Sequence, residues 1–144
     1  MSLYLDTSCL LKVFFPEPET SRVLELIGLE EEVIVSSLTR LEAVGQVHAR
    51  VAGRHLRRAR AVRLIERLDR VLRQPPYQAV DLPAEVIAAA ERQARVLDGT
   101  GYCRTLDRLH LAAMEVLGLR RLLTNDDTQR CAAERLSFDV TMPY

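Results

Sequence analysis

The sequence of 144 residues contains few of the features that mark secreted, membrane-spanning or redox-active proteins. Its three cysteines are widely spaced and form no C-x-x-C pair, which argues against a zinc or thiol-redox site and indicates reduced core residues. No run of about 18 uninterrupted apolar residues occurs, and charges enter at Asp6 and Lys12, too early for the apolar segment of a signal peptide. We therefore expect a soluble, cytoplasmic protein with no membrane partner.

The chain also has few aromatic residues and no formal net charge. Aromatic residues make up 5% of the chain, and Tyr4, Tyr77 and Tyr102 are too scattered to form a surface on which bases would stack. Twenty basic residues balance twenty acidic ones, but nine arginines fall between Arg50 and Arg73. This segment predicts either a surface that contacts RNA phosphates or a solvated outer face.

What the chain does have is an ordinary globular composition, with 48% hydrophobic and 28% charged residues. A chain of this length is the size of one common domain, and no segment has the composition of a linker. We therefore expect residues 1–144 to form a single domain around one core.

Short apolar runs alternate along the chain with longer stretches of helical periodicity. This pattern predicts an α/β fold in which helices cover both faces of a parallel sheet. The expected strands cover residues 3–6, 33–35, 77–82, 122–124 and 138–140. The expected helices cover residues 7–15, 19–29, 37–52, 56–73, 83–97, 104–117 and 126–136.

Asp6 ends the first expected strand and directly precedes a helix, and Asp126 follows the strand expected at residues 122–124 and opens the next helix. Parallel strands end at one edge of the sheet, where open α/β folds bind their ligands, so both side chains are candidates for a functional site there. Each aspartate is equally suited to be a helix N-cap. Asp127 competes with Asp126 for either role.

Glu42 lies on the helical stripe that we expect to pack inward, which is formed by Leu38, Leu41, Gly45 and Ala49. A buried glutamate needs a partner, because desolvation of an unpaired charge is costly. The partner is either a metal ion or an arginine, for which Arg40 and Arg50 are the candidates.

Asp107 lies on a helix that is almost wholly apolar, with Cys103, Leu111 and Met114 on the same side. Burying its carboxylate requires a compensating positive charge. Arg104, three residues earlier, can supply that charge as a structural ion pair, and a bound cation is the alternative.

If Asp6, Glu42, Asp107 and Asp126 converge, each carboxylate raises the pKa of the others, and a divalent cation relieves the repulsion. Carboxylate oxygens without histidine or thiolate suit Mg²⁺ or Mn²⁺. Such ions activate water and neutralise charge in phosphodiester hydrolysis.

Four motifs occur in order along the chain: D-T-S at Asp6–Ser8, S-x-L-T-x-x-E ending at Glu42, R-T-L-D-x-L-H-L-A from Arg104, and T-x-D ending at Asp126. Together they resemble the PIN-domain family, most closely its VapC-type toxins, over nearly the whole chain. The resemblance implies a three-layer α/β/α fold with a parallel five-stranded sheet, and a Mg²⁺- or Mn²⁺-dependent endoribonuclease. It also implies a homodimer that cuts RNA and is inhibited by a cognate antitoxin protein.

The same resemblance assigns the four acids as catalytic metal ligands, with the hydroxyls of Thr7, Ser8 and Thr124 supporting them. Asn125 departs from the family, which usually has an apolar or aromatic residue before the fourth acid. His110 also lies inside a matched motif, but its apolar neighbours favour a hydrogen-bonded core residue, so we leave it out of the site.

Two other functions are consistent with parts of the sequence. A haloacid-dehalogenase-like phosphatase also has an aspartate after its first strand, but it needs a second aspartate at the position that Ser8 occupies. A non-catalytic nucleic-acid-binding module would use the arginine-rich helical hairpin, with the acids serving as caps and ion pairs. Dependence of activity on a metal distinguishes these alternatives.

Overall fold

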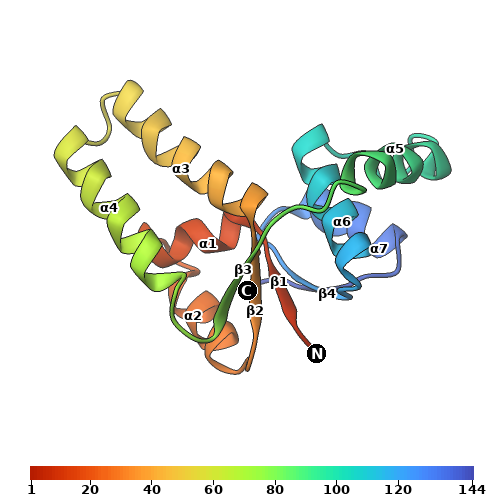
Figure 1. The fold of residues 1–144 in the computed structure, drawn as a ribbon, viewed down its shortest axis with the longest axis horizontal. Coiled ribbons are helices and arrows are strands. Elements are labelled where there is room, and N and C mark those ends of the chain that lie inside the picture. Colours follow the sequence, from red (N-terminus) through yellow and green to blue (C-terminus); the bar gives the residue numbers. More distant parts are fainter.

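The computed structural model describes residues 1–144 and contains one five-stranded sheet, in which every strand pair is parallel (Figure 1). The strand order is β3-β2-β1-β4-β5. The strands are β1 (Leu3–Leu5), β2 (Val33–Ser36), β3 (Tyr77–Val80), β4 (Arg121–Leu123) and β5 (Asp139–Thr141). The helices are α1 (Thr7–Phe14), α2 (Thr20–Gly28), α3 (Ser37–Ala52), α4 (Arg58–Val71), α5 (Val86–Leu97), α6 (Thr105–Leu117) and α7 (Asp127–Arg135).

Helices cover the sheet on both faces, which confirms the expected three layers (Figure 1). Successive side chains of a strand point to opposite faces. Leu3 and Leu5 therefore pack in one core cluster with residues of α1 to α4. Tyr4 packs in a second cluster with residues of α5, α6 and α7. All residues of β1 and β2 are buried, as expected for strands that are covered on both sides.

The sheet order places a topological switch point between β1 and β4. From β1 the chain adds β2 and then β3 on one side, and β4 and β5 lie on the other side. Ligands of open α/β sheets bind at the carboxyl ends of the strands where the order reverses. Asp6 follows β1 and Thr124 follows β4, so the switch point lies between them.

The structure corrects the expected beginnings of two helices. The helix expected from residue 56 begins at Arg58, because the backbone N–H groups of His55 and Leu56 both donate to the carbonyl oxygen of Arg50 and close a turn there. The helix expected from residue 83 begins at Val86. It is preceded by a turn in which the Val86 N–H donates to Pro83.

The cysteines are all free, as predicted, but only Cys9 and Cys103 are buried. Burial raises the pKa of the Cys9 thiol to about 12. Cys131 is exposed on α7, so its assignment to the core was wrong. No helix is both long enough and apolar enough to cross a membrane.

Candidate active site at the carboxyl edge of the sheet

Asp6 is both the N-cap of α1 and the residue at the switch point, so the two interpretations of this residue are compatible. Its Oδ2 accepts hydrogen bonds from the Ser8 backbone N–H at 3.2 Å and the Ser8 hydroxyl at 2.6 Å. The Thr124 hydroxyl donates to the same oxygen at 3.0 Å. Asp6 is buried. Its carboxylate is therefore held in place by Ser8 of α1 and by Thr124, which follows β4.

Asp126 caps α7, and its Oδ1 accepts from the Gln129 backbone N–H at 3.0 Å. Its own N–H donates to the Thr124 hydroxyl at 3.1 Å, so Thr124 connects Asp126 with Asp6. The side chain of Asp127 is instead 71% exposed and pairs with Arg130 at 3.2 Å. Of the two neighbouring aspartates, Asp126 is the one that shares hydrogen-bond partners with Asp6.

Gln129 is a further polar group at this edge that the sequence analysis missed. It is completely buried. The amide orientation that satisfies its neighbours places its nitrogen 2.8 Å from the Thr124 hydroxyl and 3.2 Å from Asp6 Oδ2. A glutamine three residues after a capping aspartate is a usable sequence signal, because it lies over the same end of the helix.

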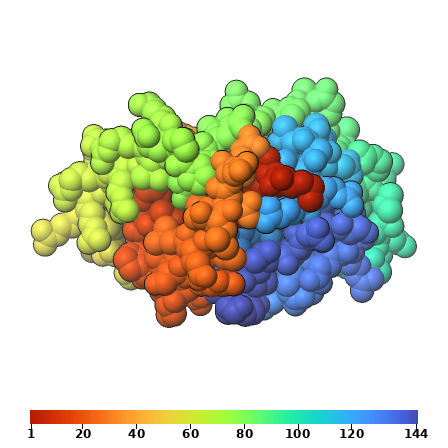
Figure 2. All heavy atoms as spheres, turned by 90° about the horizontal axis from the view of Figure 1, so that it is seen from below, coloured from red at the N-terminus to blue at the C-terminus, as the bar shows by residue number.

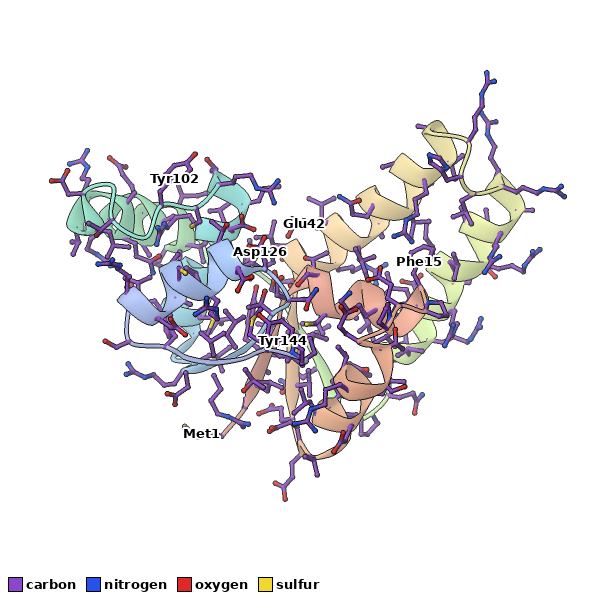
Figure 3. All side chains as sticks on the ribbon, turned by 180° about the vertical axis from the view of Figure 1, so that it is seen from behind. Met1, Phe15, Glu42, Tyr102, Asp126 and Tyr144 are labelled. Carbon is purple, nitrogen blue, oxygen red and sulfur yellow. The ribbon has the colours of Figure 1, made fainter.

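Glu42 does not lie on the inward face of α3 that we predicted. Leu41 is 67% exposed, and Gly45 and Ala49 are exposed as well. The buried face is formed by Leu38, Thr39, Ala43 and Val47. Glu42 lies at the boundary of that face, with 22% of its side chain exposed. Figure 3 shows it near the start of α3, on the same side of the sheet edge as Asp126.

Neither arginine that we considered pairs with Glu42. Arg40 pairs with Asp69, and the Arg50 guanidinium lies 3.5 Å from the centre of the Phe15 ring. Glu42 instead accepts a hydrogen bond from the Thr7 hydroxyl at 2.9 Å and contacts His110 Nε2. Burial acts to raise the pKa of Glu42, but the hydrogen bond and charge of His110 outweigh it and hold the pKa below its ordinary value.

His110 links the acids to the core. Its ring is fully buried, with Nδ1 2.7 Å from the Tyr4 hydroxyl and Nε2 in contact with Glu42 and 3.6 Å from Asp6 Oδ1. The Tyr4 hydroxyl lies in turn 2.7 Å from the Ser36 hydroxyl. His110 is thus a hydrogen-bonded core residue, as predicted, but its contacts with two of the acids were missed. Its position three residues after Asp107 was the available signal.

Asp107 is buried on α6 with only 8% of its surface exposed. Arg104 Nε donates to its carboxylate at 3.4 Å, so the ion pair that we considered as an alternative to a bound cation is present. Burial raises the pKa of Asp107, and the charges of Asp126 and Asp6 raise it further against the opposing effect of Arg104. The exposed Arg104 therefore does not compensate fully for the burial of this carboxylate and for the negative charges near it.

Arg104 lies beside Asp107 at the exposed rim of this edge. Its side chain is 80% exposed, and the nearby charge of Asp107 raises its pKa first, with smaller contributions from Asp126 and Glu42. Contacts join the other acids: the Thr124 hydroxyl connects Asp6 with Asp126, and His110 Nε2 contacts Glu42 and lies 3.6 Å from Asp6 Oδ1. The four acids thus come from α3, α6 and the ends of β1 and β4 to one edge of the sheet.

The donor chemistry at this edge fits a hard divalent cation, since the edge offers carboxylate oxygens, which such cations prefer. Burial of Asp107 and the nearby charges of Asp126 and Asp6 raise its pKa, and a cation would relieve that cost. In the structure, however, no three acidic, histidine or cysteine side chains lie close enough together to bind one ion. Glu42 in particular is turned toward His110 and Thr7. Metal binding would require these side chains to reorient.

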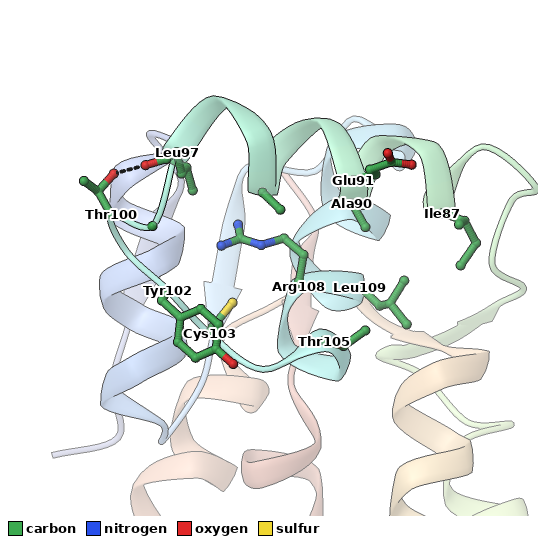
Figure 4. Close-up of a pocket in the computed structure, with 12 residues that line it drawn as sticks. Ile87, Ala90, Glu91, Leu97, Thr100, Tyr102, Cys103, Thr105, Arg108 and Leu109 are labelled. Atoms are coloured by element: carbon green, nitrogen blue, oxygen red, sulfur yellow. Dashed lines mark hydrogen bonds between the residues drawn. The ribbon is translucent and has the colours of Figure 1, made fainter.

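A separate cavity of about 380 Å³ lies between α5 and α6, and none of the four acids lines it (Figure 4). Its wall includes the exposed side chains of Ile87 and Tyr102. Arg108 reaches across it and donates to the Gly101 carbonyl oxygen at 3.2 Å, which ties the loop after α5 to α6. The acidic edge is therefore the polar site of the two.

An α/β/α fold with carboxylates at the switch point is the framework of the PIN domain, and the sequence model of that family matches residues 3–134. The chain belongs to the PIN-domain family. It is 31% identical to Ribonuclease VapC46 of Mycobacterium tuberculosis, in an alignment that covers 99% of this chain and 98% of that protein.

Solved structures agree on the fold. The crystal structure of DNA-bound VapBC from Salmonella typhimurium superposes with a TM-score of 0.74 at 15% identity, covering 100% of this chain and 99% of that one. Mycobacterium tuberculosis VapC20, a toxin that cleaves the sarcin-ricin loop, superposes with a TM-score of 0.64 at 15% identity, covering 90% and 94%. At these identities the likeness concerns the fold.

Proposed function

We propose that this protein is a divalent-metal-dependent endoribonuclease and the toxin of a VapBC-type toxin–antitoxin pair. The observation that carries the proposal is Asp107, a buried carboxylate whose pKa is raised by burial and by the neighbouring Asp126 and Asp6. Carboxylates whose pKa is shifted by burial and by neighbouring charges cluster at functional sites. The similarity to a VapC ribonuclease supports the same activity.

In this proposal Asp6, Glu42, Asp107 and Asp126 hold Mg²⁺ or Mn²⁺. The bound ion supplies the charge that favours a hydroxide nucleophile and stabilises the leaving oxygen of a phosphodiester. The chain orients the acids: Thr124 and Ser8 fix Asp6, Thr7 fixes Glu42, and Gln129 fixes Asp126. Arg104, exposed at the rim, is placed to contact an RNA phosphate beside Asp107.

A cognate antitoxin and a homodimer belong to the same proposal. VapC structures similar in fold to this chain include a VapBC complex, and we expect an antitoxin protein to bind this chain and block its site. We expect the location to be cytoplasmic. Co-purification of the chain with the product of an adjacent gene, followed by a cleavage assay of both forms, tests this partner.

The activity is tested by incubating the purified protein, freed of any partner, with labelled RNAs in Mn²⁺ and in EDTA. We expect cleavage with Mn²⁺ alone. Cleavage that persists in EDTA would overturn the metal site. Salt-sensitive binding without cleavage of any RNA would favour the non-catalytic nucleic-acid-binding module.

We predict that the neighbouring aspartates Asp126 and Asp127 differ in their effect on cleavage. Asp126→Asn should lower the rate by about 100-fold or more, since even groups that only orient metal ligands are worth 10–100-fold. Asn is a good N-cap, so α7 should remain intact. Asp127→Asn removes a side chain that is exposed and paired with Arg130, and should change the rate by less than about 2-fold.

Initial rates at saturating Mn²⁺ measure both effects, and circular dichroism of the two variants checks that the fold is kept. Equal losses of activity in the two variants would contradict the assignment of Asp126, rather than Asp127, as the fourth metal ligand. Full activity in both would remove residue 126 from the site.

A further inference from the structure

Eight arginines of the α3–α4 hairpin form an exposed cationic surface, which we call the hairpin surface. They are Arg54, Arg57, Arg58, Arg60, Arg63, Arg67, Arg70 and Arg73, and all are exposed. The hairpin forms one end of the molecule, while α5 lies at the opposite end (Figures 1 and 2). Ala61, Leu64 and Leu68 pack on the inner side of α4, whereas the arginines of this helix are exposed.

None of the arginines of the hairpin surface forms an ion pair, which separates them from most other arginines of the chain. Those that do pair with an acid are Arg22, Arg40, Arg92, Arg95, Arg104, Arg121 and Arg130. Residues 50–73 contain only two acids, and one of them, Asp69, is paired with Arg40. The rest of the chain has eleven basic and eighteen acidic residues. A chain with no net charge thus carries a strong positive field at one end.

The composition of this surface fits a nucleic acid better than a protein partner. Protein interfaces are built around apolar and aromatic anchors. Within residues 50–73 the large exposed hydrophobic residue is Val62, whereas Ile87, Val96 and Tyr102 are exposed at the other end of the molecule. Interfaces with nucleic acid are much more positively charged. The absence of aromatic residues from the segment indicates contact with phosphates rather than with bases.

The spacing of the cations also suits a phosphate backbone. Arg60, Arg63, Arg67 and Arg70 recur about once per turn of α4, which has a pitch of about 5.4 Å. They form a row of regularly repeated charges on one side of the helix. A strand of phosphates offers regularly repeated negative charges to such a row.

Arg54 adds an independent observation. It follows the last turn of α3 with φ at 61°, a left-handed conformation that costs a non-glycine residue about 1–2 kcal/mol. Glycine would satisfy this turn without that cost. An arginine in a strained position at the tip of a charged hairpin points to a use for its charge.

We propose that the hairpin surface binds the phosphate backbone of RNA and so holds the substrate for the acidic edge. The identity of the polyanion as RNA rests on the proposed function. α3 joins the two sites directly, because Glu42 lies in its second turn and Arg54 follows its last residues. Binding here is independent of base sequence, so the surface contributes affinity and leaves the choice of cleavage point to the edge of the sheet.

The experiment measures fluorescence anisotropy of a short, labelled single-stranded RNA in EDTA, over a series of KCl concentrations. The test variant combines Arg60→Gln, Arg63→Gln and Arg70→Gln. The matched control combines Arg22→Gln, Arg92→Gln and Arg95→Gln, three arginines that are also on the surface but are ion-paired. Both variants lose the same net charge. Arg67 is left in place because its guanidinium lies 5.2 Å from the Phe14 ring centre.

We expect the test variant to bind RNA at least about 10-fold more weakly. Its slope of log Kd against log salt should fall by about 2, since each phosphate contact on a single strand contributes about 0.7. The control should keep the wild-type affinity and slope. Equal weakening of both variants, or of neither, would overturn the proposal. Normal RNA binding by the test variant together with lost binding of a polyglutamate peptide would overturn it in favour of an acidic protein partner.

A parallel cleavage assay in Mn²⁺ separates this proposal from the proposed function. Wild-type protein that binds RNA through the hairpin surface but cuts nothing would count against the nuclease alone. Wild-type protein that cuts RNA, with a test variant that binds and cuts normally, would overturn the hairpin surface alone.

Arg54→Gly should have effects of opposite sign on stability and binding. Relief of the left-handed conformation should raise the free energy of unfolding by about 1 kcal/mol, and loss of one phosphate contact should weaken RNA binding and lower the salt slope by about 0.7. Urea unfolding and the same anisotropy assay measure the two effects. Unchanged RNA affinity would exclude Arg54 from the hairpin surface.

Discussion

Replacing Asp107 by asparagine is expected to lower RNA cleavage by about 1000-fold or more, to the level of the protein without metal, and to make the metal-free protein more stable by about 1 kcal/mol. The two effects have one cause. The carboxylate is buried beside Asp126 and Asp6, which is unfavourable without a cation and useful with one. The amide keeps the shape and removes the charge. The ion pair with the exposed Arg104 offsets little, because such pairs are weak.

The stability effect has a predictable pH dependence. Burial and neighbouring acids raise the pKa of Asp107 above its ordinary value of 3.8, so the folded state favours the protonated form. Wild-type protein is therefore destabilised above the folded pKa and recovers as the pH falls through it. The advantage of the variant should be complete near pH 7, shrink as the pH is lowered through the folded pKa, and disappear below the ordinary value.

Urea unfolding in EDTA, at a series of pH values, measures this difference. Asp81→Asn is the matched control, because Asp81 is exposed in the loop after β3 and forms no ion pair. It should change neither cleavage nor stability. An Asp107→Asn protein that still cuts RNA, or one less stable than wild type at neutral pH, would refute the assignment of this carboxylate.

Replacing His110 by alanine is expected to cost about 3 kcal/mol of stability, the largest such loss that we predict. The ring is completely buried, so truncation leaves a cavity. It also removes one hydrogen-bond partner each from the Tyr4 hydroxyl and from Glu42. Cleavage should fall as well, because Glu42 would keep only Thr7 among its hydrogen-bond partners.

Two variants calibrate this loss. Tyr4→Phe removes the hydroxyl that bridges His110 and Ser36 but leaves the ring, so it should cost about 1 kcal/mol. His48→Ala removes an exposed histidine of α3 and should have little effect on unfolding. If His110→Ala were as stable as His48→Ala, the contacts of His110 with Tyr4 and Glu42 would not contribute to the free energy of unfolding.

The positions of Asp6 and Asp126 were predictable from the sequence because they depend on local patterns. A buried strand followed by a helix places the intervening residue at the carboxyl edge of a parallel sheet, whatever the rest of the chain does. The burial of Asp107 was equally local, since its i+4 and i+7 neighbours Leu111 and Met114 are apolar. The same patterns did not separate Asp126 from Asp127, because the two residues are adjacent at the beginning of α7.

The surroundings of Glu42 could not be predicted from local sequence patterns. Leu38 and Leu41 suggested the inward face of α3, but the position of α4, α1 and the sheet around the helix decides which side is covered, and Leu41 remained exposed. The partner of Glu42 comes from α6, 68 residues away. No periodicity within α3 carries that information.

The sequence by itself determined the alternation of strands and helices, the acids at the two strand ends and the arginine stripe of α4, because each follows from residues within a few positions of one another. Only the tertiary structure decided the strand order, the chain from Glu42 through His110 to Tyr4, and which arginines find an acid. These depend on which surfaces meet across long separations in sequence. The pairing of side chains from distant elements is a property of the assembled fold, and for that reason it is defined only when the helices are packed on the sheet.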